Sequence, residues 1–253
     1  MIKMKTIKKI GCLFLLVATI SLSAQESTLL RYNFKKGDKY LLEMSLKQDM
    51  ASMMNMDLGF KMMMESNGKV GDNYKIIYSF ERMVMKMIAA GNEVNFDSDE
   101  KEENMGEEEK KMKAEMAPFF EMLMHQTINK YGKVIGMKIE PDVKGANQFF
   151  SQSQLMSMEY PKEQVKVGSE WSHSQSISGM EMKGTYIVKK ITKDKVFADF
   201  LGNMSSTIEG KITGTAEVSR SSGMILDMTL DMNISTGGMD MTMNVHMKAE
   251  KVK

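Results

Sequence analysis

The stretch from Met224 to Lys248, MILDMTLDMNISTGGMDMTMNVHMK, decides the fold because apolar and polar residues alternate on both sides of a glycine pair. The apolar set is Met224, Leu226, Met228, Leu230, Met232 and Ile234 before the glycines, and Met239, Met241, Met243, Val245 and Met247 after them. Strict alternation indicates half-buried strands, and Gly237-Gly238 supplies a turn between them. The stretch therefore predicts a long β-hairpin whose buried face consists largely of methionine.

The same alternation recurs earlier in the chain. Two further sets share a face in this way: Leu58, Phe60, Met62 and Met64, and Met180, Met182, Tyr186 and Val188. The 253 residues include 31 methionines, and in these strands methionine stands where leucine or valine could stand. The sequence predicts a mainly β fold, with antiparallel curved sheets or half-barrels and one or two short helices.

The segment Tyr74–Ile88 has a different pattern. Its aromatic and aliphatic face consists of Tyr74, Ile76, Tyr78, Phe80, Val84 and Ile88. Alternation places Met83, Met85 and Met87 on the opposite face, unless a β-bulge shifts the register. A strand that is apolar on both faces needs a second layer or a ligand over the extra face. Met83, Met85 and Met87 are therefore the predicted ligand-binding residues.

A charged insertion at 97–124 interrupts the strands. Acids and lysines dominate Asp97–Glu115, which predicts a solvated loop leading into a helix. Met112, Met116, Phe119 or Phe120, and Leu123 are spaced for one helical face. Pro118 is expected to end or kink that helix near Ala117. A second short helix is expected around 147–158.

The N-terminus resembles an export signal. A basic head is followed by an apolar run from Ile10 to Leu22 and then by Ser23-Ala24. This order is typical of a signal peptide, predicted at 1–24, and the run is too short to span a membrane. Cys12 lies inside the run rather than at the cut, so a lipoprotein is not expected. The chain is expected to be exported to the periplasm, secreted or associated with the outer membrane, without a transmembrane span.

The remainder, 25–253, is expected to form a single β-rich domain that divides into two repeats at about 29–140 and 160–253. Gly37-Asp38-Lys39-Tyr40 precedes a strand in the first repeat, and Gly168-Ser169-Glu170-Trp171 does so in the second. Each repeat later reaches a turn with glycine two residues before valine or isoleucine, at Gly132 and Gly223.

The sequence carries no recognisable catalytic or metal-binding motif. His125, His173 and His246 have no second ligand-type residue at metal-site spacing. Asp97-Ser98-Asp99-Glu100 resembles the start of a calcium loop, but lysine follows at the fifth position and the glycine of the sixth is missing. The net charge is only +1, without a basic stripe, so nucleic acid is not an expected partner. We expect no enzyme, no cofactor and no His- or Cys-based metal site.

The methionines leave several interpretations open. They can fill the core in place of leucine, or line a site that adapts to a hydrophobic small molecule or lipid. Their thioethers can bind Cu(I) or Ag(I), although alternate positions of one strand chelate only if neighbouring strands contribute. Sacrificial oxidation is a further use. A partner protein of the cell envelope is an alternative to a small ligand.

Several segments resemble an uncharacterised family of secreted or envelope proteins from Bacteroidota-like bacteria, classed as a domain of unknown function. They are KGDKY at 36–40, NFDSD at 95–99, YGKV at 131–134, YP at 160–161 and VKVGSEW at 165–171. The resemblance implies an envelope setting and a β-rich domain and carries no site residues. In its strand-rich layout the chain is also similar to open-barrel carriers that shuttle lipids or lipoproteins across the periplasm.

Overall fold

The computed structural model describes residues 26–50, 53–143, 146, 158–177, 180–205, 209–236 and 239–252. The predicted signal peptide at 1–24 lies outside these residues. So does the second predicted helix over 147–157, while Met158 is described, is not helical and is fully buried.

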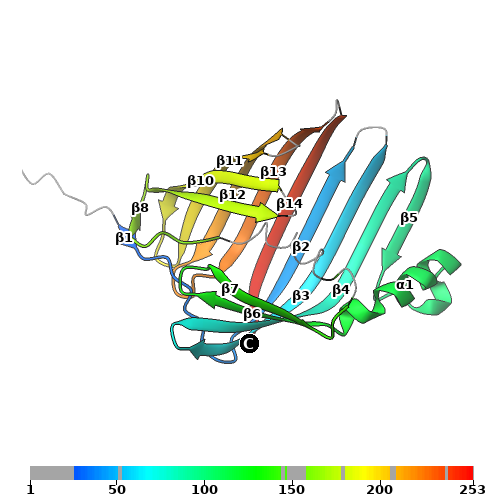
Figure 1. The fold of residues 1–253 in the computed structure, drawn as a ribbon, viewed down its shortest axis with the longest axis horizontal. Coiled ribbons are helices and arrows are strands. Elements are labelled where there is room, and N and C mark those ends of the chain that lie inside the picture. Colours follow the sequence, from blue (N-terminus) through cyan, green and yellow to red (C-terminus); the bar gives the residue numbers. More distant parts are fainter. Residues whose placement is uncertain are drawn as a thin grey trace, which may run out of the picture.

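The structure is built almost entirely of antiparallel strands (Figure 1). The strands are β1 (Ser27–Thr28), β2 (Lys39–Asp49), β3 (Met54–Val70), β4 (Asn73–Ala89), β5 (Asn92–Asp97), β6 (Leu123–Asn129), β7 (Val134–Glu140), β8 (Val165–Lys166), β9 (Glu170–Ile177), β10 (Met180–Ile191), β11 (Lys195–Ser205), β12 (Glu209–Ser219), β13 (Ile225–Thr236) and β14 (Met239–Val252). A short 3₁₀ helix (Glu102–Asn104) and helix α1 (Glu107–Phe120) follow β5. The prediction of a mainly β fold with curved antiparallel sheets is confirmed.

One 12-stranded sheet carries nearly all of the strands. Its order is β7-β6-β4-β3-β2-β14-β13-β12-β11-β10-β9, with β5 paired to the far end of β4, and β1 pairs separately with β8. The sheet is open, with β7 and β9 at its two ends, and both ends bend over the same face in Figure 1. We call the face that they bend over the inner face, and the opposite one the outer face.

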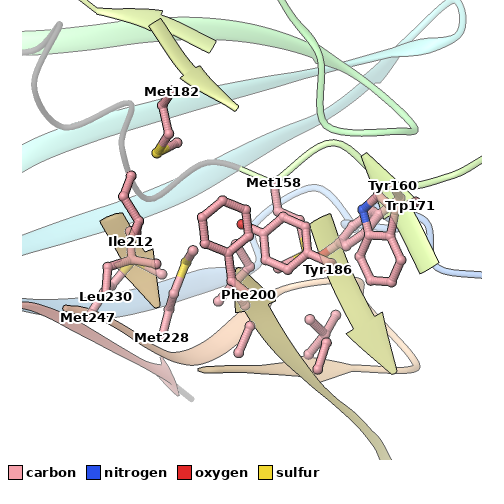
Figure 2. Close-up of a cluster of buried hydrophobic side chains, with 14 of the residues drawn as sticks. Met158, Tyr160, Trp171, Met182, Tyr186, Phe200, Ile212, Met228, Leu230 and Met247 are labelled. Atoms are coloured by element: carbon pink, nitrogen blue, oxygen red, sulfur yellow. The ribbon is translucent and has the colours of Figure 1, made fainter. Parts of the chain in front are cut away.

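The hydrophobic core lies on the inner face because strand alternation sends the apolar side chains there. The predicted hairpin is present as β13 and β14, with Met232 opposite Met243 and Leu230 opposite Val245. Aromatic side chains of β9–β11 pack over this hairpin (Figure 2). A second cluster, which includes Tyr40 and Met64, covers the inner face of β2–β4 and β6.

Two crossing segments close one end of the inner face and form a floor. Tyr32 donates its backbone N–H to the carbonyl of Lys130 (2.9 Å), and Tyr160 does the same to Tyr131 (2.7 Å). The rings of Tyr32 and Tyr160 lie 5.2 Å apart, and the Tyr160 hydroxyl donates to the carbonyl of Gly223 at 2.6 Å. Burial raises the pKa of Tyr32 to about 12, so its hydroxyl stays protonated at ordinary pH.

The turns at Gly37 and Gly168 make the same hydrogen bonds. Each glycine has a φ of +84°, the left-handed conformation that glycine adopts without strain. The Gly37 N–H donates to the carbonyl of Ser66 in β3, and the Gly168 N–H donates to the carbonyl of Val188 in β10. The two turns therefore attach β2 to β3 and β9 to β10 in the same way. The two-repeat organisation stays a prediction.

Helix α1 ends later than the sequence predicts. It begins at Glu107, inside the acidic segment, where Glu107–Glu109 in the first turn interact favourably with the helix dipole. It runs past Pro118 to Phe120, because the missing proline N–H removes a single hydrogen bond in the last turn. Leu123 begins β6 instead of extending the helical face, and its side chain is exposed. No helix among the described residues is long and apolar enough to cross a membrane.

Candidate functional site: a methionine face on the inner side of the sheet

A β-bulge at Glu81 decides where the predicted site residues lie. In the pairing of β3 with β4, Lys61 faces Arg82 and the next residue, Met62, faces Phe80, so Glu81 has no partner in β3. One extra residue in a strand exchanges the faces of everything beyond it. Met83 is therefore opposite Phe60, on the same face as Phe80.

Met83, Met85 and Met87 thus lie on the inner face, together with the aromatic residues of β4. The expectation that they occupy the opposite face is wrong, and the bulge is the reason. The exchange also corrects the position of Val84 and Ile88, which lie on the outer face and are 40% and 38% exposed. The strand therefore has one apolar face along its whole length.

The turn between β4 and β5 extends this surface. Ala90 and Gly91 both have positive φ (50° and 82°), as a two-residue turn between twisted antiparallel strands requires. The turn brings Phe96 opposite Met85 and Val94 opposite Met87. Beyond the bulge, the inner surface of β4 therefore continues onto β5.

On the inner face of β3, burial falls with distance from the floor. In β3, Met64 and Met62 are buried, whereas Phe60, Leu58, Met56 and Met54 are only partly buried. In β4, Met83 is buried (8% exposed), and Met85 and Met87 are partly exposed. We call Met54, Met56, Met83, Met85 and Met87 the methionine face. It is the part of the inner surface farthest from the floor.

The methionines come together across strands as well as along them. Met56 is directly opposite Met87, and Leu58 is opposite Met85. Directly opposite residues have Cβ atoms about 4.5–5.5 Å apart. The neighbouring inner positions of β2 are Leu46 and Gln48, so the lining is apolar apart from one amide. An uncharged surface of this kind favours uncharged apolar groups.

Helix α1 lies beside this surface and contacts β4 and β5. Its C-terminal Phe120 meets Phe80 edge to face, with ring centroids 6.4 Å apart. Beyond the helix, Met122 and Met124 pack with Tyr78 and Phe80 in a small separate cluster. The helix thus borders the methionine face on the side of the bulge.

A cavity of about 110 Å³ lies between the floor and the methionine face. Its lining includes Tyr32, Met44, Met62 and Met224, but not Met83, Met85 or Met87. Met44 is opposite Phe60, and Phe60 is opposite Met83, so adjacent side chains lead from the cavity to the methionine face. The cavity and the face form one continuous apolar surface.

Two larger hollows have more charged and polar residues in their lining. One of about 390 Å³ is lined mostly by polar residues, including Lys47, Asp57 and Asn244, and also by Met56 of the methionine face. Another of about 610 Å³ is lined by Lys183 and Lys211, among others. Outer residues of the strands make up most of the lining of both hollows.

The three histidines lie apart from one another. His125 is 3.5 Å from Glu140, His246 is 3.3 Å from Asp227, and His173 is buried among aromatic rings. Asp97, from the segment that resembles a calcium loop, forms an ion pair with Arg82 instead. Among the described residues, no group of three or more His, Cys, Asp or Glu side chains could hold a metal ion.

Sequence reasoning found the methionines of β4 but not their partners in β3 and β5. It missed Met54 and Met56, and also Phe96, which is 3% exposed. The pairing register between β3, β4 and β5 depends on the bulge at Glu81 and on the turn at Ala90-Gly91. The alternation of residues within one strand predicts neither of them.

Sequence comparison finds no matching protein family and no matching curated protein. Among solved structures, the fold is similar to that of lipovitellin, in a structure titled for its lipid–protein interactions, with a TM-score of 0.58. The sequence identity is 9%, and the match covers 87% of this chain and 26% of that chain. The chain therefore spans about a quarter of the lipovitellin chain, and the likeness is one of fold.

Proposed function

We propose that the protein is an exported, non-enzymatic component of the cell envelope that binds a hydrophobic ligand on the methionine face. The observation that carries the proposal is the bulge at Glu81. It adds Met85 and Met87 to an inner surface that is apolar and only partly buried. The export part of the proposal depends on the predicted signal peptide.

Methionine suits such a surface because its side chain is unbranched, flexible and polarisable. A methionine lining adapts to apolar chains of different shape. A charged group would meet no opposite charge among the inner side chains of β3 to β5, and burying an unpaired charge is costly. The ligand class is therefore an uncharged apolar chain, or a lipid whose head group stays in water.

The size of the cavity limits where such a ligand can lie. Ligand pockets usually measure about 300–1,000 Å³, whereas this cavity measures about 110 Å³. The ligand therefore extends over the methionine face rather than lying inside the cavity alone. The fold shared with lipovitellin, a protein described by its lipid–protein interactions, supports a lipid as the ligand class.

Titration of the chain without its predicted signal peptide with retinol tests the proposal. Retinol is uncharged and apolar, and its fluorescence increases in an apolar site. Met85→Lys places a charge on the methionine face, whereas Val84→Lys places the same charge on the neighbouring, outward-facing position. We expect saturable binding that Met85→Lys weakens by more than about tenfold and that Val84→Lys leaves nearly unchanged. Absence of binding, or equal effects of the two variants, would contradict the proposal.

Soft-metal binding is a second candidate because neighbouring strands do contribute thioethers. Met56 is opposite Met87, and Met85 lies two positions along the same face. Calorimetric titration with Ag(I) tests this candidate. Binding tighter than micromolar that is lost in Met56→Leu/Met87→Leu would support it, and weaker binding would remove it.

A further inference from the structure

We propose that the partly exposed methionines of the methionine face form a modification site, at which oxidation to the sulfoxide releases the bound ligand. This inference rests on the proposed function and adds a regulation of the same site. It applies to Met56, Met85 and Met87, which lie at neighbouring inner positions, whereas Met54 is opposite Ala89 rather than another methionine.

The described methionines of the inner face differ in exposure. Core methionines are almost completely buried: Met64, Met158, Met228 and Met232 are at most 2% exposed. Met56, Met85 and Met87 are partly exposed although they lie on the same inner face. Oxidation of methionine depends on access of the oxidant to sulfur. The methionine face should therefore react before the core does.

The oxidant is a peroxide, and the reaction transfers one oxygen atom. The sulfur lone pair attacks one oxygen of hydrogen peroxide. An S–O bond forms as the O–O bond breaks, and the second oxygen takes both hydrogens and leaves as water. Sulfur loses two electrons and the peroxide gains them. The product is a polar, chiral sulfoxide that methionine sulfoxide reductases return to the thioether.

The positions of these residues explain why the ligand would leave. Met56 and Met87 are directly opposite, and Met85 follows on the same face, so three sulfoxide oxygens would enter one small apolar area. A ligand that covers these oxygens removes their water without replacing its hydrogen bonds, which is unfavourable. The fully buried methionines of β13 are oxidised later, so the core stays packed while the methionine face is oxidised.

Stepwise treatment with hydrogen peroxide tests the inference, with peptide mass spectrometry to locate oxidation and retinol titration to measure binding. We expect Met56, Met85 and Met87 to be oxidised before Met228 and Met232. The affinity for retinol should fall in parallel by more than about tenfold, while near-ultraviolet circular dichroism stays unchanged.

Leucine variants test whether oxidation of these three methionines causes the loss of retinol binding. Met56→Leu/Met85→Leu/Met87→Leu keeps the surface apolar but removes the three sulfur atoms, so the affinity of this variant for retinol should be the same before and after peroxide. Met63→Leu, on the outer face of β3, is the matched control and should lose binding on oxidation.

Each contrary outcome has a distinct meaning. If the reduced protein binds retinol and the oxidised face binds it equally well, the regulation is overturned and the proposed function stands. If the reduced protein binds nothing, both are overturned. Early oxidation of the buried methionines, or loss of tertiary structure together with affinity, would also overturn the regulation.

Discussion

The two halves of the sheet share one strand pattern but fill their inner faces differently. In β9–β13, large side chains lie over glycines. Phe200 covers Gly184 and Gly202, and Leu230 covers Gly214. In β3–β5, the inner positions farthest from the floor hold methionine, leucine and phenylalanine, and many of them are only partly buried. Pairing large with small residues gives a packed core, whereas flexible residues of similar size leave an accessible apolar surface.

The two halves also differ in how far burial extends. Ile234, close to the far end of β13, is 3% exposed, and Met204 of β11 is 6% exposed. At the corresponding end of β3 and β4, Met56 and Met87 are partly exposed. The C-terminal half is therefore the more completely packed of the two, and the N-terminal half carries the accessible apolar surface that we propose as the binding site.

The largest expected difference is between two phenylalanines. Phe200→Ala removes a side chain that is 1% exposed, and should lower the free energy of unfolding by about 3–5 kcal/mol. Phe60→Ala removes a partly exposed ring, so it should cost about 1–2 kcal/mol. Urea denaturation of both variants measures the difference. Equal losses would show that the two inner faces are packed alike.

Adding a side-chain atom at a glycine tests the same difference in packing between the two halves. In Gly184→Ala, the new Cβ would lie 2.3 Å from Cζ of Phe200 and 2.7 Å from the carbonyl oxygen of Leu201. Relief of this overlap should cost about 1–3 kcal/mol in the free energy of unfolding. Gly136→Ala on β7 is the control, because nothing lies within 4 Å of its new Cβ. A loss of stability in the control as large as in Gly184→Ala would contradict the account.

The packed half also buries a titratable group. His173 is 5% exposed, its Nδ1 has no hydrogen-bond partner and its Nε2 lies 3.3 Å from Gln175. Burial lowers the pKa of His173 below its ordinary 6.5, although Gln175 and the charge of Glu159 oppose this shift. Below pH 6.5 the unfolded chain binds a proton that the folded chain does not. The free energy of unfolding should therefore fall with decreasing pH, by at most about 1.4 kcal/mol per pH unit.

His173→Gln isolates this contribution from that of the carboxylates. Urea denaturation of the variant and the unmodified chain at about pH 7.5 and about pH 5.5 measures the two slopes. We expect the variant to lose less stability on acidification. Identical slopes would mean that His173 does not contribute to the pH dependence.

The smallest expected effect comes from deleting Glu81. With the bulge, removal of the unpaired residue leaves Phe80 opposite Met62, Arg82 opposite Lys61 and Met83 opposite Phe60. The change in the free energy of unfolding should be below about 1 kcal/mol. If β4 had no bulge, the same deletion would exchange the faces of its last residues and destabilise the sheet strongly.

Local patterns predicted much of the fold. Alternation placed Met228 to Ile234 on a buried face. The predicted turn at Gly237-Gly238 lies outside the described residues, but β13 ends and β14 begins on either side of it. The proline rule misjudged α1, since Pro118 in the last turn costs the helix little. The bulge and the glycine spaces under Phe200 depend on contacts between strands distant in sequence. Alternation within one segment cannot reveal them, so the sequence named Met83, Met85 and Met87 but assigned them to the wrong face.

Photo-cross-linking with a diazirine analogue of hexadecanol tests most directly whether the methionine face is the binding surface. The probe is uncharged and apolar, and mass spectrometry assigns each labelled residue. We predict labels on Met54, Met56, Met85 and Met87, which unlabelled hexadecanol suppresses by competition. Labels on the inner face of β10–β13, or on Val84 and Ile88 of the outer face, would contradict the account.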